Sequence, residues 1–120
     1  MEKLIPWIVQ FIPSMFLEES GKHRFELALE ELFVNLIEHG YKKLAHPVFV
    51  TIYPGKDHFQ CEIRDFAPPF NPLTHNSYDA PRDLDSQPIG GQGIKFIKAV
   101  FENIDYCFMN DMNVIRLKLG

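Results

Sequence analysis

A carboxylate and a carboxamide lie four residues apart in the stretch ELFVNLIEHG, residues 31–40. Residues at this spacing share one face of a helix, so Glu31 and Asn35 would point the same way. Asn is a mediocre helix former, and a buried amide must find hydrogen-bond partners. The two side chains could serve a hard cation and a water or hydroxyl, because Mg²⁺ takes oxygen ligands and commonly keeps waters and substrate phosphates. The alternative interpretation is a solvated polar stripe.

Two further segments carry groups that could bind a ligand. In RDFAPPFNP, residues 64–72, Asp65 ends an alternating strand and could accept hydrogen bonds from a ligand's exocyclic amine. The alternative is an Asp that caps a turn. In GGQG, residues 90–93, glycines at a helix start permit close approach of ligand atoms, and free amides there attract phosphate. The alternative is a flexible hinge, and the sequence has neither a P-loop pattern nor a strand just before these glycines.

The elements that must position these groups follow from the hydrophobic periodicity. Pro13 should kink the first helix and Gly21 should stop it. A loop as long as residues 66–92 is uncommon unless it is functional or mobile. The predicted elements are helices over 4–19 and about 23–43, strands over 48–53 and 58–65, a helix with the seam Ile94, Ile97, Phe101 and Ile104, and strands over 104–109 and 114–120. Paired antiparallel strands with separate helices indicate a two-layer α+β domain with its helices on one face of the sheet.

Length and composition limit the classes of protein. The 120 residues predict a single domain spanning 1–120, and the net charge of -4 gives no overall basic footprint for nucleic acid. The two cysteines form no CxxC pair or disulfide framework, which favours a reducing compartment, and both fall in apolar runs typical of a core. The apolar start is short and interrupted by prolines, so it predicts neither a membrane span nor a signal peptide. We therefore expect a cytoplasmic protein that binds neither nucleic acid nor membrane.

The order and spacing of the three segments resemble those of the GHKL ATP-binding domains, most closely the anti-sigma-factor serine/threonine kinase branch. ALEELFVNLIEHGY resembles the N box, RDFAPPFNP the first glycine box, and IGGQGIKFIKAVFENIDY the second glycine box with its helix. The likeness covers roughly residues 4 to 120. It implies a Bergerat-type ATP-binding fold, with a mostly antiparallel four-stranded sheet and three helices on one face.

The resemblance also implies roles for individual residues. Asn35 would be the protein ligand of Mg²⁺, Glu31 the base that orients or deprotonates the attacking hydroxyl, and Asp65 the acceptor of the adenine amine. Backbone amides of the glycine cluster would line the triphosphate, and residues 71–89 would form the ATP lid. The implied ATP-binding residues are Asn35, His39, Asp65, Ala67, Phe70, Gly90, Gly91, Gln92, Gly93 and Ile94. Phosphoryl transfer needs mainly positioning and charge neutralisation, so this small set is chemically sufficient.

The implied function is an ATP- and Mg²⁺-dependent kinase that phosphorylates a small antagonist protein and binds a sigma factor. One alternative is a nucleotide-gated binding module without useful catalysis, and another is a degenerate domain that binds no nucleotide. Ala67 replaces the family's usual Gly and would be strained if the backbone there needed positive φ. The family usually opens with an edge strand before the first helix, and we expect that strand to be missing or trimmed here. Its loss would expose a sheet edge that could support a homodimer. His39 could instead be a capping or packing residue.

Overall fold

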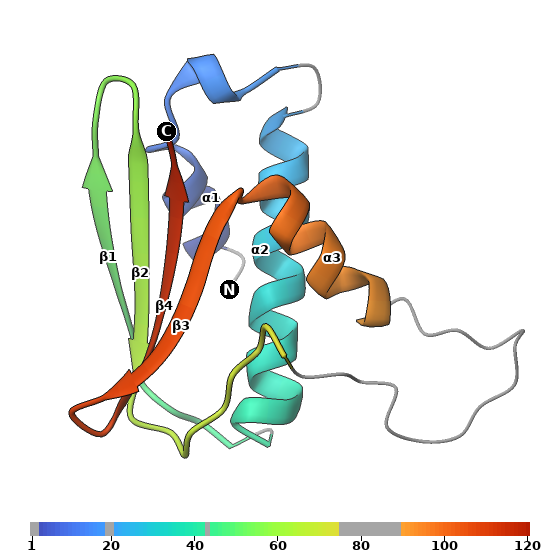
Figure 1. Ribbon diagram of the computed structural model, residues 1–120, viewed down its shortest axis with the longest axis vertical. Helices are drawn as coiled ribbons and strands as arrows, with labels where there is room; N and C mark the ends of the chain where they lie inside the picture. Colours follow the sequence, from blue (N-terminus) through green and yellow to red (C-terminus); the bar gives the residue numbers. More distant parts are fainter. Residues whose placement is uncertain (1–2, 19–20, 43, 75–89) are drawn as a thin grey trace, which may run out of the picture.

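The chain folds into two layers, a four-stranded antiparallel sheet and a layer of helices on one of its faces (Figure 1). The computed structural model describes residues 3–18, 21–42, 44–74 and 90–120. In the described residues the sheet has the order β1-β2-β4-β3, with every neighbouring pair antiparallel. The strands are β1 (Val48–Pro54), β2 (Phe59–Asp65), β3 (Asn103–Met109) and β4 (Met112–Leu119). The predicted α+β class is confirmed, and β1 and β3 are the edge strands of this sheet.

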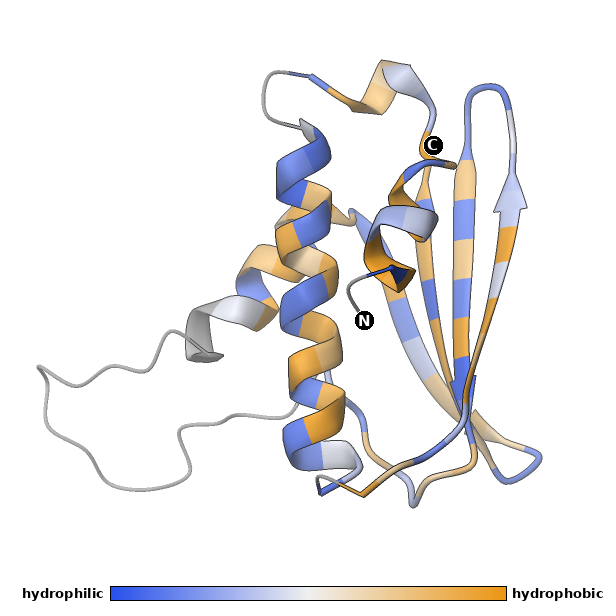
Figure 2. Cartoon of the chain, turned by 180° about the vertical axis from the view of Figure 1, so that it is seen from behind, coloured by the Kyte–Doolittle hydropathy of each residue, from blue (hydrophilic) through white to orange (hydrophobic). Residues whose placement is uncertain are grey.

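The central strand β2 shows why the alternating sequence folds as it does. Phe59, Cys61, Ile63 and Asp65 are all buried, whereas the residues between them are partly exposed. Figure 2 shows the resulting alternation of hydrophobic and hydrophilic bands along this strand. Because successive side chains of a strand point to opposite faces, Asp65 must lie on the same face as the apolar core. The prediction that both cysteines are core residues is right for Cys61 and wrong for Cys107, which is only partly buried.

The β3–β4 hairpin differs from the prediction because its turn is shorter. Asn110 and Asp111 have φ values of 53° and 61°, which identifies a two-residue turn of the kind that matches strand twist. β4 therefore begins at Met112, and Asn113 is a strand residue rather than part of a four-residue turn. Asn113 is paired in register with Asp65 of β2 and is buried.

The first two helices differ from the prediction at their boundaries. Helix α1 is only Leu4–Val9, followed by a 3-10 turn at Ser14–Phe16, rather than one kinked helix over 4–19. Pro13 explains the early end, because it lacks an amide donor and disfavours helical geometry in the residue before it. Helix α2 spans Gly21–Asn35, so Gly21 begins the second helix rather than stopping the first.

Helix α3 runs from Gly90 to Val100. The predicted helical seam is wrong at its last member, since Ile104 lies in β3 and pairs with Leu117. Helices α1, α2 and α3 of the described residues pack over the sheet through one continuous apolar core. On α2 this core takes Phe25, Ala28, Leu29, Leu32 and Phe33. Among the described residues, no helix combines the length and apolar character needed to cross a membrane.

Candidate functional site

The segments that carry the predicted site residues lie toward one end of the molecule, where β2 and α2 end and the loop after β2 runs alongside the last turns of α2 (Figure 1). Two contacts tie these segments together. The Asn35 amide nitrogen donates to the Pro72 carbonyl at 3.3 Å, across 37 residues of sequence. The Phe70 ring packs so closely on Gly40 that a Cβ there would lie 2.7 Å from a ring carbon. Segments that are far apart in the sequence are thus brought together as the prediction requires.

Helix α2 changes its geometry at Asn35. The next five residues, Leu36–Gly40, form a π-helical turn, closed by a 2.6 Å bond from the Tyr41 amide to the Leu36 carbonyl. Such turns are rare and frequently occur at functional sites. Asn35 is partly buried, and its contact with Pro72 uses the donor side of the amide. The carboxamide oxygen, which is the atom a cation would take, is therefore not the atom bound to Pro72.

Glu31 lies directly against the first turns of α3. A Cβ built on Gly93 would be 2.6 Å from the Glu31 Oε2 atom, so only glycine permits this approach. Gly93 is buried, and Ile94 beside it is partly buried. The N-terminal end of a helix favours negative charge, which suits a carboxylate at this place. Gly90, Gly91 and Gln92 form the start of α3, as predicted, and the predicted lid beyond residue 74 lies outside the described residues.

Asp65 is deeply buried, with only 1% of its surface exposed. Its Oδ1 atom accepts hydrogen bonds from the Ala67 amide at 3.0 Å and from the Asn113 amide nitrogen at 2.8 Å. Its Oδ2 atom accepts one from the Tyr41 hydroxyl at 2.5 Å. A carboxylate offers about four acceptor positions, so three protein donors leave about one for a ligand. This arrangement anchors the Asp65 carboxylate on the sheet. It leaves the carboxylate able to accept a hydrogen bond from a single N–H group of a ligand.

Two tyrosines in this network are held in their neutral, hydrogen-donating form. Burial, the hydrogen bond to Asp65 and the charge of Asp65 all raise the pKa of Tyr41 well above its usual range. Burial also raises the pKa of Tyr106, whose hydroxyl donates to the Asn113 amide oxygen at 2.6 Å. Both hydroxyls therefore remain donors under physiological conditions.

Asn113 is a site residue that the sequence did not reveal. In addition to Asp65, its amide nitrogen contacts the Ala67 carbonyl at 3.0 Å and the Pro68 carbonyl at 3.1 Å. Its amide oxygen accepts the Phe70 amide at 3.0 Å. The predicted strands 104–109 and 114–120 leave residues 110–113 between them as a turn, so the sequence pattern does not mark Asn113 as a site residue. The register of β4 against β2, which depends on the two-residue turn, would have been the signal.

Three other predicted residues have mixed outcomes. The condition for strain at Ala67, a positive φ, is not met, because the positive-φ residues other than glycine in the described chain are Lys42, Asn110 and Asp111. Ala67 is buried, and its amide supports Asp65.

His39 is an exposed residue of the π-helical turn. The described start of the predicted lid is ordered by Asn71, whose side chain accepts the Leu73 amide at 2.9 Å.

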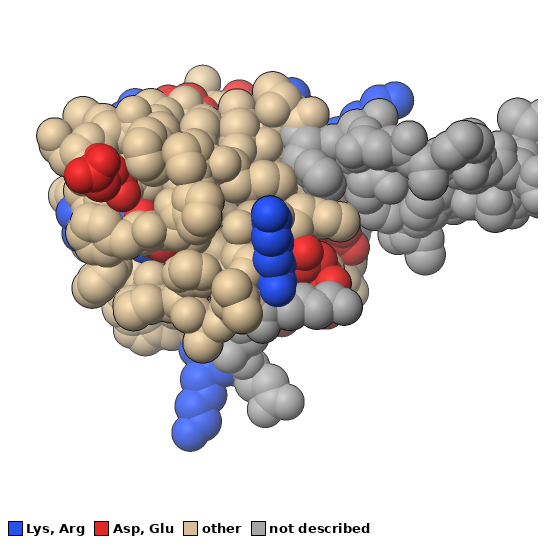
Figure 3. All heavy atoms as spheres, turned by 90° about the horizontal axis from the view of Figure 1, so that it is seen from below, with Lys and Arg blue, Asp and Glu red and all other residues tan. Residues whose placement is uncertain are grey.

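Uncharged residues form most of the visible surface at this end of the molecule (Figure 3). Among the described residues, the predicted ATP-binding set contains no Lys or Arg. A bound cation and the backbone amides at the start of α3 are groups that could balance the charge of a bound triphosphate. The Asn35 oxygen and the glycine-rich helix start supply donor types that fit those two demands.

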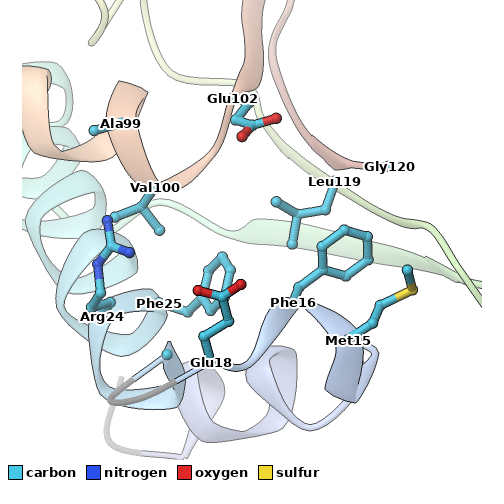
Figure 4. Close-up of a pocket in the computed structure, with 11 residues that line it drawn as sticks. Met15, Phe16, Glu18, Arg24, Phe25, Ala99, Val100, Glu102, Leu119 and Gly120 are labelled. Carbon is cyan, nitrogen blue, oxygen red and sulfur yellow. The ribbon is translucent and has the colours of Figure 1, made fainter.

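A separate cavity of about 470 Å³ lies at the opposite end of α2. It is lined by side chains that include Arg24, Phe25, Val100 and Leu119, all labelled in Figure 4. None of the predicted ATP-binding residues lines it. This cavity is therefore distinct from the candidate site.

The fold defines a class, the two-layer α+β domains with a four-stranded antiparallel sheet and helices on one face. A sequence profile for the histidine kinase-like ATPase domain matches residues 2–119. The chain therefore belongs to that family, within the GHKL superfamily, and family membership implies ATP binding and kinship with kinases.

A solved structure of the Acinetobacter baumannii histidine kinase AdeS is similar, with a TM-score of 0.57 and 19% sequence identity. The match covers 82% of this chain but only 46% of that one, and at this identity it shows the fold alone. A search of curated proteins finds no match.

Proposed function

We propose that this chain binds Mg-ATP at the end of α2 and acts as a serine/threonine protein kinase of the anti-sigma-factor type. The observation that carries the proposal is the convergence of three segments: α2 with Glu31 and Asn35, the end of β2 and its loop with Asp65, and the start of α3 with Gly93. Asp65 would accept the adenine amine through its remaining acceptor position, and the Asn35 oxygen would hold Mg²⁺. The amides at the start of α3 would contact the phosphates. Bound Mg²⁺ would neutralise charge on the triphosphate.

In the proposed reaction a serine hydroxyl of the substrate attacks the γ-phosphorus of ATP. A new O–P bond forms, the bond from the γ-phosphorus to the bridging oxygen breaks, and ADP leaves with that oxygen. Glu31 would orient the hydroxyl and accept its proton, for which its position beside Gly93 at the start of α3 is suitable. The protein contributes mainly positioning, which explains why so few charged side chains suffice.

The proposed partners are a small antagonist protein as substrate and a sigma factor as binding partner, which would make the chain a cytoplasmic regulator of transcription. These partners come from the sequence resemblance, as does a homodimer through an exposed sheet edge. A second candidate function is a nucleotide-gated binding module without useful catalysis. The packing of Glu31 against Gly93 of α3 favours the binding module, because this contact could give Glu31 a purely structural role in place of a catalytic one.

The first experiment is thermal unfolding with and without Mg-ATP. A ligand that binds only the native state at a concentration of about 100 Kd stabilises it by about 2.7 kcal/mol. We expect Asn35→Ala to lose this stabilisation in Mg-ATP while keeping the unfolding temperature of the ligand-free parent within a few degrees. Val34→Ala, at the exposed neighbouring position of α2, is the matched control and should respond to Mg-ATP like the parent. If Asn35→Ala responds like the parent as well, the metal role of Asn35 is wrong.

The second experiment separates the kinase from the binding module. The protein is incubated with γ-labelled ATP and a candidate antagonist protein, and phosphoserine formation is measured. Glu31→Gln should keep ATP-dependent stabilisation and lower transfer by about 10²- to 10⁴-fold, as expected for loss of a general base. Glu30→Gln, at the exposed neighbouring position, should leave transfer unchanged. Proven ATP binding without transfer by the parent would support the binding module.

A further inference from the structure

The side chain of Asn113 is saturated with hydrogen bonds inside the protein. Its two N–H groups are shared among three acceptors, namely Asp65 Oδ1 and the carbonyls of Ala67 and Pro68. Its oxygen accepts from both the Phe70 amide and the Tyr106 hydroxyl, which fills both of its acceptor positions. Asn113 is only 2% exposed. It therefore has no hydrogen-bonding capacity left for a ligand.

The orientation of this amide is dictated by its partners. The Phe70 amide can only donate, so the atom facing it must be the oxygen of Asn113. The carbonyls of Ala67 and Pro68 can only accept, so the atom facing them must be the nitrogen. A flipped amide would place like groups against each other at four contacts, since among the five partners only the Tyr106 hydroxyl can turn to accept. The side chain is thus locked in one orientation.

This locked amide in turn fixes the Asp65 carboxylate. Asn113 and the Ala67 amide together occupy both acceptor positions of Oδ1. Tyr41 occupies one position of Oδ2, which leaves the other Oδ2 position as the one place for a ligand's N–H. Because Oδ1 is held from two directions, the carboxylate cannot rotate, and the direction of the remaining acceptor position is defined.

We propose that Asn113 is a positioning residue that determines base selectivity by holding Asp65 so that it accepts one N–H from the nucleotide base. The inference rests on the proposed ATP-binding function. It also connects the base-reading carboxylate to the loop after β2, because the same amide binds that loop at Ala67, Pro68 and Phe70. A ligand with an amine at this point forms the remaining bond. A ligand with a carbonyl there places oxygen against oxygen.

The test compares the binding of ATP with that of inosine triphosphate, in which a carbonyl replaces the exocyclic amine. Calorimetric titration with Mg²⁺ should show the parent protein preferring ATP by about 100-fold or more, since a site built around an N–H rejects an analogue that lacks it. Asn113→Ala should lose most of this preference, to within about threefold, mainly through weaker ATP binding. Asn103→Ala, at an exposed Asn of the adjacent strand β3, is the matched control and should keep the parent preference.

A purely structural role for Asn113 predicts a different result, in which both nucleotides lose affinity by the same factor and the preference is unchanged. That outcome would overturn the proposal. If Asn113→Ala does not fold, Tyr106→Phe decides, because it removes one donor from the Asn113 oxygen without leaving a large cavity. It should reduce the preference several-fold, and an unchanged preference would again overturn the proposal.

The failure of the proposed function looks different. A parent protein that binds neither nucleotide contradicts ATP binding itself, and the proposal falls with it. A parent that binds both nucleotides equally leaves nucleotide binding intact but contradicts the selectivity proposal and the role of Asp65 as acceptor of the adenine amine.

Discussion

Replacing Asp65 by Ala should destabilise the fold far more than replacing it by Asn. Asp65→Ala leaves the Tyr41 hydroxyl and the Ala67 amide without acceptors inside the protein, whereas the Asn113 nitrogen keeps its two carbonyl partners. An orphaned buried donor costs about 1–3 kcal/mol, so two cost about 2–6 kcal/mol. Removal of a buried charge offsets part of this cost. We expect a net loss of about 3 kcal/mol in the free energy of unfolding.

Asp65→Asn preserves shape and most of the hydrogen bonds. Its amide oxygen can accept the two donors that Oδ1 now accepts, and its nitrogen can donate to the Tyr41 hydroxyl, which would turn round to accept. The loss is then the extra strength that a charged acceptor gives to its bonds, about 1 kcal/mol in total. The base-reading acceptor would nevertheless become a donor or be misdirected, so nucleotide binding should be lost in both variants.

Urea unfolding measures both variants against the parent, with unchanged m-values as the check that the unfolding reaction is the same. The sharper test introduces Tyr41→Phe into the parent and into the Asp65→Ala protein. In the parent this change should destabilise the protein, because Asp65 loses a hydrogen-bond donor. In the Asp65→Ala background it should stabilise by about 1–2 kcal/mol, because it removes the orphaned hydroxyl. The reasoning is refuted if Tyr41→Phe destabilises both backgrounds alike, or if Asp65→Ala costs no more than Asp65→Asn.

Three further predictions concern the packing around the site and the buried thiol. Gly93→Ala should leave the unfolding temperature nearly unchanged, because only the flexible Glu31 carboxylate must move, but it should lower phosphoryl transfer in the labelled-ATP assay at least tenfold. Gly40→Ala should cost about 1–3 kcal/mol in urea unfolding, because the rigid Phe70 ring cannot give way; a neutral result would show that this contact is not tight. Burial raises the pKa of the Cys61 thiol from 9.0 to about 12, so the folded state keeps a proton that the unfolded state loses above pH 9. The parent should therefore lose about 2 kcal/mol more stability than Cys61→Ala between about pH 8.5 and pH 10.5, and equal losses would contradict the assigned cause.

The sequence predicted those parts of the fold that depend on local patterns. Alternation along residues 59–65 identified β2 and placed Asp65 at its end, because a period of two is a local property. The helical spacing of Phe25, Leu29 and Leu32 likewise identified α2. Glu31 and Asn35 lie on α2 and Asp65 lies at the end of β2, as the local patterns predicted, whereas their roles came from the resemblance to a family.

The rest could not be predicted because it depends on contacts between distant segments. The helical seam continued through Ile104, since periodicity does not show where a helix gives way to an edge strand. Asn113 was missed because its role exists only through its register against Asp65. The expected strain at Ala67 came from a family pattern, whereas the backbone of this chain turns there without positive φ.

The π-helical turn at Leu36–Gly40 has a consequence for anyone who redesigns this protein. A π turn holds one residue more than an α turn between the same hydrogen-bonded levels, and each residue of an α-helix advances the chain by about 100°. Regularising the helix by deleting one residue would therefore swing the tyrosine that follows it about a quarter of a turn away from its carboxylate partner. Scores that reward ideal helices would favour that deletion. The irregular turn should be kept as a fixed constraint in any stabilised version of the domain.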